Sequence, residues 1–296
     1  MTSPLEMTAV AEPIAPQGSV RGFLRLVAIE HSIFALPFAY IAALVEMGDH
    51  VDWQVLGLIT LAMVSGRTVA MAANRVIDRE LDARNPRTAQ RELVTGTLSV
   101  RTAVIGAAVA LAVFVVTAAA LSPLCLALSP IALVVFVAYP YAKRFTWLCH
   151  FVLGLAQAIV PTGAAIAVAD EWTVPVALAI AVGTWVAGFD LIYACQDVAS
   201  DRREGVHSLP ARFGVPRGLE VSGLLHVVTV AALLWYGDDA GLGPGWFIGV
   251  VLVAAALCYE HVIVKPDDLS RVNRAFFTVN GFVGLGLLVA YLVNRL

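Results

Sequence analysis

The chain has 296 residues, of which 59% are hydrophobic and 14% are charged, and its mean hydropathy is +0.82. Soluble domains carry about 25% charged residues, so this composition excludes an ordinary soluble enzyme and indicates a polytopic protein in a lipid bilayer. The formal net charge is only −3, and we expect no nucleic acid among the partners. The four cysteines lack the spacing of a zinc site or of a disulfide framework.

The first 20 residues differ in composition from the rest of the chain. They contain prolines, alanines and two glutamates, but no basic segment followed by an apolar core. Residues 1–20 are therefore predicted to be a disordered cytoplasmic tail and not a signal peptide. Residues 21–296 are predicted to form a single transmembrane domain.

Nine apolar segments are long enough to cross a bilayer, which takes about 20 helical residues. The predicted fold class is an all-α polytopic membrane protein with nine transmembrane helices around a central cavity. The segments cover residues 26–46, 54–73, 102–121, 124–141, 147–168, 174–195, 219–236, 246–264 and 275–293. Only Ser122 and Pro123 separate the third segment from the fourth, which predicts a tight helical hairpin.

Basic residues occur in alternate loops between these segments, and the other loops carry Asp and Glu but no Lys or Arg. Only Arg67, within the second segment, and Arg295, at the C-terminus, depart from this pattern. Because loops rich in Lys and Arg stay on the cytoplasmic side, the N-terminus is predicted to be cytoplasmic and the C-terminus external. We expect a multi-pass protein of the plasma membrane.

Two related acidic stretches each close a hydrophobic segment on the predicted cytoplasmic side. Their polar residues are Asn74, Asp78 and Asp82 in the first stretch, and Tyr193, Asp197 and Asp201 in the second. Each residue of the second stretch follows its counterpart by 119 positions. This offset spans an even number of helices, so the two stretches run in the same direction. We therefore expect the two acidic clusters to face each other across the cavity.

The spacing of the carboxylates indicates a cation site. Residues four apart lie on one face of a helix, and Pro86 and Gly205 end the two helices shortly afterwards. Stacked carboxylates near the negative end of a helix dipole are unfavourable by roughly 0.3–1 kcal/mol. One or two carboxylates, completed by substrate phosphates, commonly hold Mg²⁺. The repeated pattern therefore predicts a Mg²⁺–diphosphate site with its active site toward the cytoplasm.

These motifs, NxxxDxxxD and YxxxDxxxD, resemble those of the UbiA family of intramembrane aromatic prenyltransferases. The resemblance extends over the chain from residue 20 onward and includes YPYAKRFT at 139–146 and DRREGVHSLPARFG at 201–214. Within the family, four further strings are most similar to menaquinone-branch members. They also occur in proteins described as 4-hydroxybenzoate polyprenyltransferases. The strings are EHSIFALPFAY (30–40), NPRTAQREL (85–93), FTWLCHFVLG (145–154) and GFDLIYACQD (188–197).

The resemblance implies that Asn74, Asp78 and Asp82 hold one Mg²⁺ and that Asp197 and Asp201 hold another, each bridging oxygens of a polyprenyl diphosphate. These five residues are the expected catalytic and metal-ligating set. Metal ions neutralise the charge that develops on a diphosphate leaving group. The allylic cation that remains is attacked by an electron-rich aromatic carbon, and an apolar wall keeps water away from the cation.

Basic residues near the motifs are the next candidates. By resemblance, Arg144 or its neighbour Lys143 contacts the diphosphate or an acceptor carboxylate, whereas the alternative is an ordinary positive charge of a cytoplasmic loop. Arg67 lies seven residues before Asn74 on nearly the same helix face, where an ionisable group usually points into the bundle and meets an acid. His150 is expected to be a hydrogen-bonding residue at a helix end, not a ligand.

Glu30, Asp190 and Tyr193 complete the candidate substrate-binding set. Glu30 and its neighbour His31 lie early in the first segment, where they either snorkel to or cap the interface, or Glu30 orients the acceptor, or one of the two takes the ring proton. Asp190 precedes the second acidic motif on the same face, where it can bond Arg67 or support the metal ligands. Tyr193 can bond the diphosphate or face the cation with its ring.

The expected activity is Mg²⁺-dependent transfer of a polyprenyl group to an aromatic quinone precursor that carries a carboxylate. The first expectation for this acceptor is 1,4-dihydroxy-6-naphthoate of menaquinone biosynthesis, and the alternative is 4-hydroxybenzoate of ubiquinone biosynthesis. An ion-coupled transporter is the alternative from another class, because acidic residues in a membrane bundle often mark ion pathways. Transporter sites lie near the bilayer midplane, however, whereas these carboxylates cluster at one membrane face.

Overall fold

The computed structural model describes residues 19–27 and 35–295. The tail predicted over residues 1–20 lies almost entirely outside this part, as do Glu30 and His31. Regular secondary structure in the described residues is helical, apart from one isolated β-bridge between Lys265 and Asp268. The expected all-α architecture is confirmed for this part of the chain.

Seven helices among the described residues are long and apolar enough to cross a membrane, and they coincide with seven of the nine predicted segments. Two of them, α7 and α9, continue without interruption into shorter helical turns at the end that carries the acidic motifs. The seven are α3 (Trp53–Ile77), α6 (Val100–Leu121), α7 (Pro123–Ala138, with a 3₁₀ turn to Arg144), α8 (Cys149–Ala169), α9 (Val176–Ala194), α12 (Val215–Asp239) and α13 (Pro244–Ile263).

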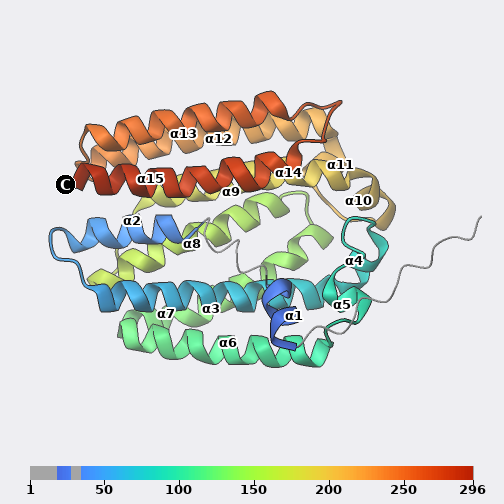
Figure 1. Cartoon of the computed structure of the whole chain (residues 1–296), viewed down its shortest axis with the longest axis horizontal. Helices are drawn as coiled ribbons and strands as arrows, with labels where there is room; N and C mark the ends of the chain where they lie inside the picture. Colours follow the sequence, from blue (N-terminus) through green and yellow to red (C-terminus); the bar gives the residue numbers. More distant parts are fainter. Residues whose placement is uncertain (1–18, 28–34, 296) are drawn as a thin grey trace, which may run out of the picture.

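The first and last predicted segments correspond to shorter helices. The described part of the first is α2 (Leu36–Met47), which has 12 residues. The last begins with a π-helical turn (Ala275–Val279) and continues as α15 (Asn280–Arg295), which has 16 residues. Figure 1 shows both α2 and α15 lying along the bundle beside the longer helices.

Serine and aspartate caps fix where several helices begin. The side chain of Asp52 accepts hydrogen bonds from the backbone N–H groups of Gln54 and Val55 at the start of α3. Ser122 alone separates α6 from α7, and its hydroxyl accepts a bond from the N–H of Cys125 while Pro123 occupies the first helical position. The predicted tight hairpin between these helices is confirmed.

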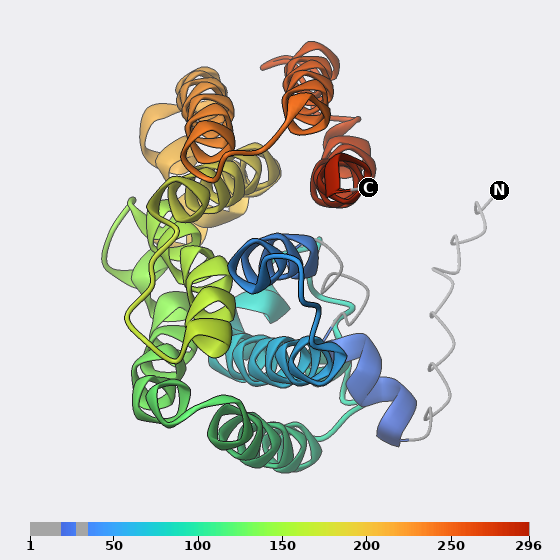
Figure 2. The ribbon, with the colours of Figure 1, turned by 90° about the vertical axis from the view of Figure 1, so that its left-hand side faces the viewer.

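Short helices gather at one end of the bundle, which positions the acidic motifs together. They are α1 (Ser19–Leu26), α4 (Arg79–Arg84), α5 (Glu92–Thr95), α10 (Val198–Glu204), α11 (Leu209–Phe213) and α14 (Val272–Arg274). Figure 1 shows α4 and α10, which carry parts of the two acidic motifs, next to each other at this end. Figure 2 looks along the helices from the opposite end.

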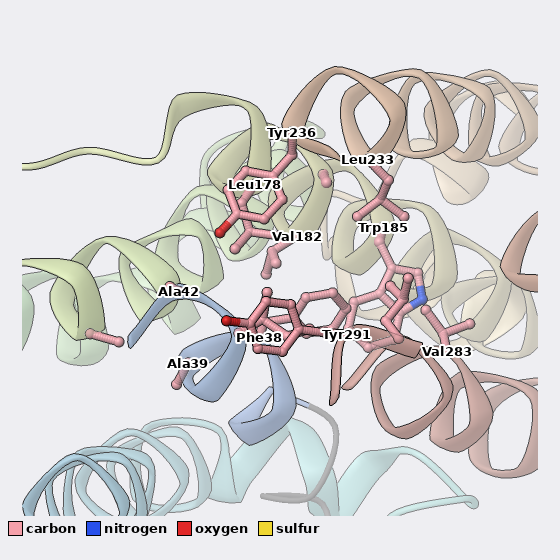
Figure 3. Packing of buried hydrophobic residues seen from close by; sticks show 14 of the residues in the cluster. Phe38, Ala39, Ala42, Leu178, Val182, Trp185, Leu233, Tyr236, Val283 and Tyr291 are labelled. Carbon is pink, nitrogen blue, oxygen red and sulfur yellow. The ribbon is translucent and has the colours of Figure 1, made fainter. Parts of the chain in front are cut away.

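The main hydrophobic core joins helices from both ends of the sequence. Phe38 of α2, Trp185 of α9, Leu233 of α12 and Tyr291 of α15 belong to this cluster (Figure 3). The rings of Phe38 and Trp185 lie 5.1 Å apart. Outward-facing side chains are also apolar, and α6, α7 and α13 expose mostly Val, Leu and Ile, as expected for helices that face lipid.

Close contact between α8 and α9 depends on glycine. A Cβ atom on Gly154 would lie 2.3 Å from the carbonyl oxygen of Gly183, whereas one on Gly163 of the same helix would meet nothing within 4 Å. Small residues at such crossings let membrane helices approach closely. This contact holds α8 at a fixed distance from α9, which carries the second acidic motif.

Gly154→Ala is therefore expected to lower the free energy of unfolding by about 1–3 kcal/mol, because the backbones of α8 and α9 would have to separate. Gly163→Ala is the matched control, and it is expected to leave stability unchanged or slightly higher. Thermal unfolding of the two variants in the same detergent measures the difference. Equal melting temperatures would contradict the proposed close packing at Gly154.

Candidate active site

A cavity of about 660 Å³ opens at the end of the bundle where the short helices gather. Its lining includes Asp78, Asp82, Asp197 and Asp201 at this end and reaches Trp172 in the loop at the other. Most of its deeper wall consists of apolar side chains from α3, α6, α7, α8 and α9. The structure therefore joins a charged mouth to a long apolar interior.

The first aspartate of each motif occupies the same backbone conformation. Asp78 ends α3 with φ −93° and ψ 4°, and Asp197 ends a 3₁₀ turn with φ −97° and ψ 0°. A turn at Asp78 interrupts the helix expected through the first motif, whereas the second motif stays helical and passes through a 3₁₀ turn that ends at Asp197. Backbone in this sparsely populated region is common at active sites, and here it re-aims the residues that follow. The matching angles support the internal repeat.

The residues that follow the first motif contact the second motif, so the two motifs lie close together, as expected from their common direction. The side-chain amide of Asn85 donates a hydrogen bond of 2.9 Å to Oδ1 of Asp197. Arg84 pairs with Glu204 at 3.2 Å, and Arg203 donates to the carbonyl oxygen of Arg84 at 2.7 Å. These bonds tie the loop after α3 to α10.

Both carboxylates of the first motif are paired with basic side chains. Asp78 is 1% exposed, and its Oδ2 lies 2.5 Å from Nζ of Lys143. Nη2 of Arg144 lies 3.5 Å from Oδ1 of Asp78, which accepts no hydrogen bond from the described residues. Oδ1 of Asp82 lies 2.5 Å from Nη1 of Arg91.

The second motif is paired in a similar way. Arg87 donates to both oxygens of Asp197, from Nε at 2.9 Å and from Nη2 at 2.5 Å, and to the hydroxyl of Tyr193 at 3.1 Å. Asp201 accepts a bond of 2.7 Å from the Ser208 hydroxyl. Burial acts to lower the pKa of Arg87, but its bonds to Asp197 outweigh burial and raise that pKa above its ordinary value.

Arg87, Arg91, Asn85 and Ser208 were not predicted as site residues. The two arginines counted only as positive charges of a cytoplasmic loop, although both belong to the string NPRTAQREL. Because this string already carried the family resemblance, its arginines could have been recognised as site candidates.

Lys143 and Arg144 are both close to Asp78, but they face different surroundings. Lys143 lines the cavity. Arg144, which the sequence favoured, donates to the carbonyl oxygen of Ile77 at 2.7 Å and lies over the ring of Tyr141. Lys143 is thus the better placed of the two for a ligand inside the cavity.

Deeper in the cavity, the structure separates two residues that could have been paired. Asp190 accepts a hydrogen bond of 2.6 Å from Nδ1 of His150, and of the two roles considered for Asp190, the bond to Arg67 is not formed. His150 is 4% exposed, whereas the Asp190 side chain keeps 28% exposure. Arg67 also lines the cavity, and it forms no ion pair with any described residue.

Aromatic side chains form one side of the cavity. Trp185, Phe189, Tyr193 and Phe276 all line it, and we call this set the aromatic wall. Neighbouring ring centroids lie 5.1 Å apart for Trp185 and Phe189, 5.3 Å for Phe189 and Phe276, and 4.4 Å for Phe276 and Tyr193. The guanidinium of Arg87 lies 4.8 Å from the Tyr193 ring, so the wall ends at the charged mouth.

Curated proteins with related sequences have a consistent name. A 4-hydroxybenzoate octaprenyltransferase of Vibrio vulnificus is 31% identical over 246 residues, which cover 81% of this chain and 86% of the relative. An enzyme of the same name from Saccharophagus degradans is 27% identical over 259 residues, covering 83% of this chain and 82% of the relative.

Solved structures agree with these relatives. A UbiA homologue from Aeropyrum pernix is 35% identical, with a TM-score of 0.84 over 90% of this chain and 99% of that one. A UbiA homologue from Archaeoglobus fulgidus bound to DMAPP and Mg²⁺ shares the fold at 20% identity, with a TM-score of 0.74 over 93% and 99% of the two chains. A sequence model of the UbiA prenyltransferase family matches residues 35–292. The chain therefore belongs to the UbiA prenyltransferase family.

Proposed function

We propose that this prenyltransferase transfers a polyprenyl group from polyprenyl diphosphate to an aromatic acceptor that carries a carboxylate. The observation that carries the proposal is the joining of two acidic motifs to the mouth of one mostly apolar cavity. Such a cavity suits a substrate with a charged head and a long apolar tail. Membership of a prenyltransferase family argues against the transporter alternative.

The acceptor we propose is 4-hydroxybenzoate. The related enzymes from Vibrio vulnificus and Saccharophagus degradans are both named for it, at 31% and 27% identity. These names favour the ubiquinone alternative over 1,4-dihydroxy-6-naphthoate, which was the first expectation from the sequence. The naphthoate remains the acceptor to test beside it.

The donor atoms at the mouth suit Mg²⁺. They are carboxylate and amide oxygens, and the unbonded, buried Oδ1 of Asp78 is available to a ligand. No three His, Cys, Asp or Glu side chains of the described residues form a ready metal cluster, which agrees with a metal held partly by phosphate oxygens. We propose Asn74, Asp78 and Asp82 as ligands of one Mg²⁺, and Asp197 and Asp201 as ligands of another. When bound, Mg²⁺ neutralises charge on the diphosphate.

In this proposal the basic residues at the mouth also bind the diphosphate. Lys143, Arg87 and Arg91 can exchange their present carboxylate partners for oxygens of the diphosphate. The bond between the first prenyl carbon and the diphosphate oxygen breaks, and its electron pair leaves with the diphosphate. These cations stabilise that leaving group while the aromatic wall encloses the allylic cation.

Residues deeper in the cavity are proposed to hold the acceptor. Arg67, a cation without an ion pair among the described residues, is placed to bind the carboxylate of the acceptor. Asp190, oriented by His150, accepts a hydrogen bond from the acceptor hydroxyl. A ring carbon attacks the allylic cation to form the new carbon–carbon bond. The same carbon then loses its proton to Asp190, and the C–H electron pair restores aromaticity.

We also propose the complete topology that the sequence predicts. α2 and α15 would belong to the first and ninth membrane spans, with the N-terminus in the cytoplasm and residues 21–296 forming one domain. The confinement of Lys and Arg to alternate loops supports this orientation. It places the charged mouth toward the cytoplasm of a plasma-membrane protein, where soluble acceptor and diphosphate are available.

The test is a membrane assay with radiolabelled polyprenyl diphosphate, in which 4-hydroxybenzoate and 1,4-dihydroxy-6-naphthoate are offered in parallel. With Mg²⁺ we expect prenylated 4-hydroxybenzoate, complete loss of product in EDTA, and recovery when Mg²⁺ is restored. A product from the naphthoate alone would refute the proposed acceptor. Absence of product from both acceptors, with folded protein, would refute the proposed activity on these substrates.

A further inference from the structure

A second group of polar side chains lies outside the candidate active site, between helices of the C-terminal half. Glu260 of α13 is fully buried, and Asn280 at the start of α15 is 1% exposed. The amide of Asn280 donates to Oε1 of Glu260 at 3.1 Å and to the carbonyl oxygen of Ala275 at 3.2 Å. His226 of α12 lies beside them, and its Nδ1 is 3.9 Å from Oε2 of Glu260.

The surroundings of Glu260 favour the neutral carboxylic acid. Its Oε2 forms no hydrogen bond with the described residues. His226 shares its Nδ1 with Nε2 of His261 at 2.9 Å, so this nitrogen is already engaged. No Lys or Arg forms an ion pair with Glu260 in the described ranges. A buried carboxylate without a cation is very unfavourable, so the acid keeps its proton.

This group is connected to the cavity through Trp185. Nε1 of Trp185 donates a hydrogen bond of 2.7 Å to Oδ1 of Asn280. Trp185 belongs to the aromatic wall, and in Figure 3 its indole lies within the packed cluster near Val283. Phe276, another member of the wall, lies in the π-helical turn that ends just before Asn280. Asn280 is therefore bonded to one end of the wall and directly follows the turn that carries another part of it.

We propose that Glu260 and Asn280 are positioning residues that hold the aromatic wall closed around the reactive end of the prenyl chain. This inference rests on the proposed prenyl transfer. Glu260 fixes the amide of Asn280, which in turn fixes the indole plane of Trp185 and the stacked rings beyond it. If the wall loosens, water reaches the allylic cation. The water oxygen then forms a bond to the cation and releases a proton to solvent, which yields prenol in place of the prenylated acceptor.

The measurement is the ratio of prenol to prenylated acceptor from one reaction with radiolabelled diphosphate. Glu260→Ala is expected to raise this ratio about fivefold or more, the change in populations that the loss of one buried hydrogen bond produces. Glu260→Gln keeps the volume, the acceptor oxygen and the neutral charge, so its ratio is expected to stay close to that of the wild type. Because it is a ratio, the amount of folded protein does not affect it.

Two other variants separate positioning from general destabilisation. Thr229→Val removes a buried hydroxyl contact of 2.8 Å to Thr184 between α12 and α9, outside the cavity lining, and is expected to leave the ratio unchanged. Trp185→Phe removes the N–H link to Asn280 together with one ring of the indole, keeps one aromatic ring, and is expected to raise the ratio even if Glu260→Ala fails to fold.

An unchanged ratio in both Trp185→Phe and folded Glu260→Ala would overturn the proposal, and so would an equal rise in Thr229→Val. If the ratio for Glu260→Gln rose as far as that for Glu260→Ala, the proposal would also be overturned, because the charged form of Glu260 would then be needed. Failure of the proposed function is recognised separately, since the wild-type protein would then form no prenylated acceptor at all.

Discussion

Asp78→Asn is expected to lower kcat for prenyl transfer by at least about 10³-fold, because the proposed metal ligand Asp78 would contribute several kcal/mol to stabilising a charged leaving group. The variant should still fold. Asparagine has the same shape, and the partner Lys143 keeps 30% exposure, so the charge left behind can remain hydrated. The assay is product formation at saturating substrate, with the Mg²⁺ concentration varied over a wide range.

Asp238→Asn is the matched control for this substitution. Asp238 is an exposed aspartate near the end of α12 and does not line the cavity, so its replacement is expected to leave kcat unchanged. Asp197→Asn, at the equivalent position of the second motif, should repeat the loss seen with Asp78→Asn. Full activity in either motif variant would rule out the two-metal assignment.

Arg67→Leu is expected to lower kcat/KM for 4-hydroxybenzoate by about 10–100-fold, the cost of losing a hydrogen bond to a charged group. The same variant should not be less stable than the wild type, because Nε of Arg67 is buried without a hydrogen-bond partner in the described part of the chain. The variant is therefore expected to lose activity without losing stability, whereas a variant with a damaged fold would lose both. Thermal unfolding and steady-state kinetics on one preparation measure both quantities.

The acceptor itself supplies the sharper control. 4-Hydroxybenzamide has the same ring and hydroxyl but no charge, and wild-type protein should prefer the benzoate. In Arg67→Leu this preference should largely disappear, whereas Arg217→Leu, on the exposed side of α12, should retain it. Retained preference for the benzoate in Arg67→Leu would assign carboxylate binding to another residue.

Much of this architecture could be predicted from local patterns. Hydrophobic segments gave seven long helices within a few residues, since membrane spans have a length set by the bilayer. The alternation of basic loops and the spacing of Asp78 and Asp197 placed both acidic motifs at one end, and the direct bond from Asn85 to Asp197 confirms it.

Contacts between distant residues could not be predicted in this way. Arg87 reaches Asp197 across 110 positions, and nothing in a basic loop distinguishes this arginine from those that only set topology. His150 lies in the first turn of α8 and forms a hydrogen bond, as expected for a residue at a helix end, but its burial and its partner Asp190 on α9 depend on the packing of α8 against α9. Glu260 was overlooked, although a carboxylate within an apolar span is itself a signal of a polar partner.

The ion pairs at the cavity mouth affect whether a metal ion can bind there between turnovers, when no substrate is present. Three of the four motif carboxylates already have an intramolecular counter-ion in Lys143, Arg91 or Arg87. A divalent cation that binds without diphosphate must displace these side chains from the carboxylates, and the net gain in binding free energy is small. When a metal binds together with diphosphate, the displaced Lys and Arg side chains can pair with the diphosphate oxygens instead. The charged mouth can thus stay open to water and still admit its metal only as part of the substrate.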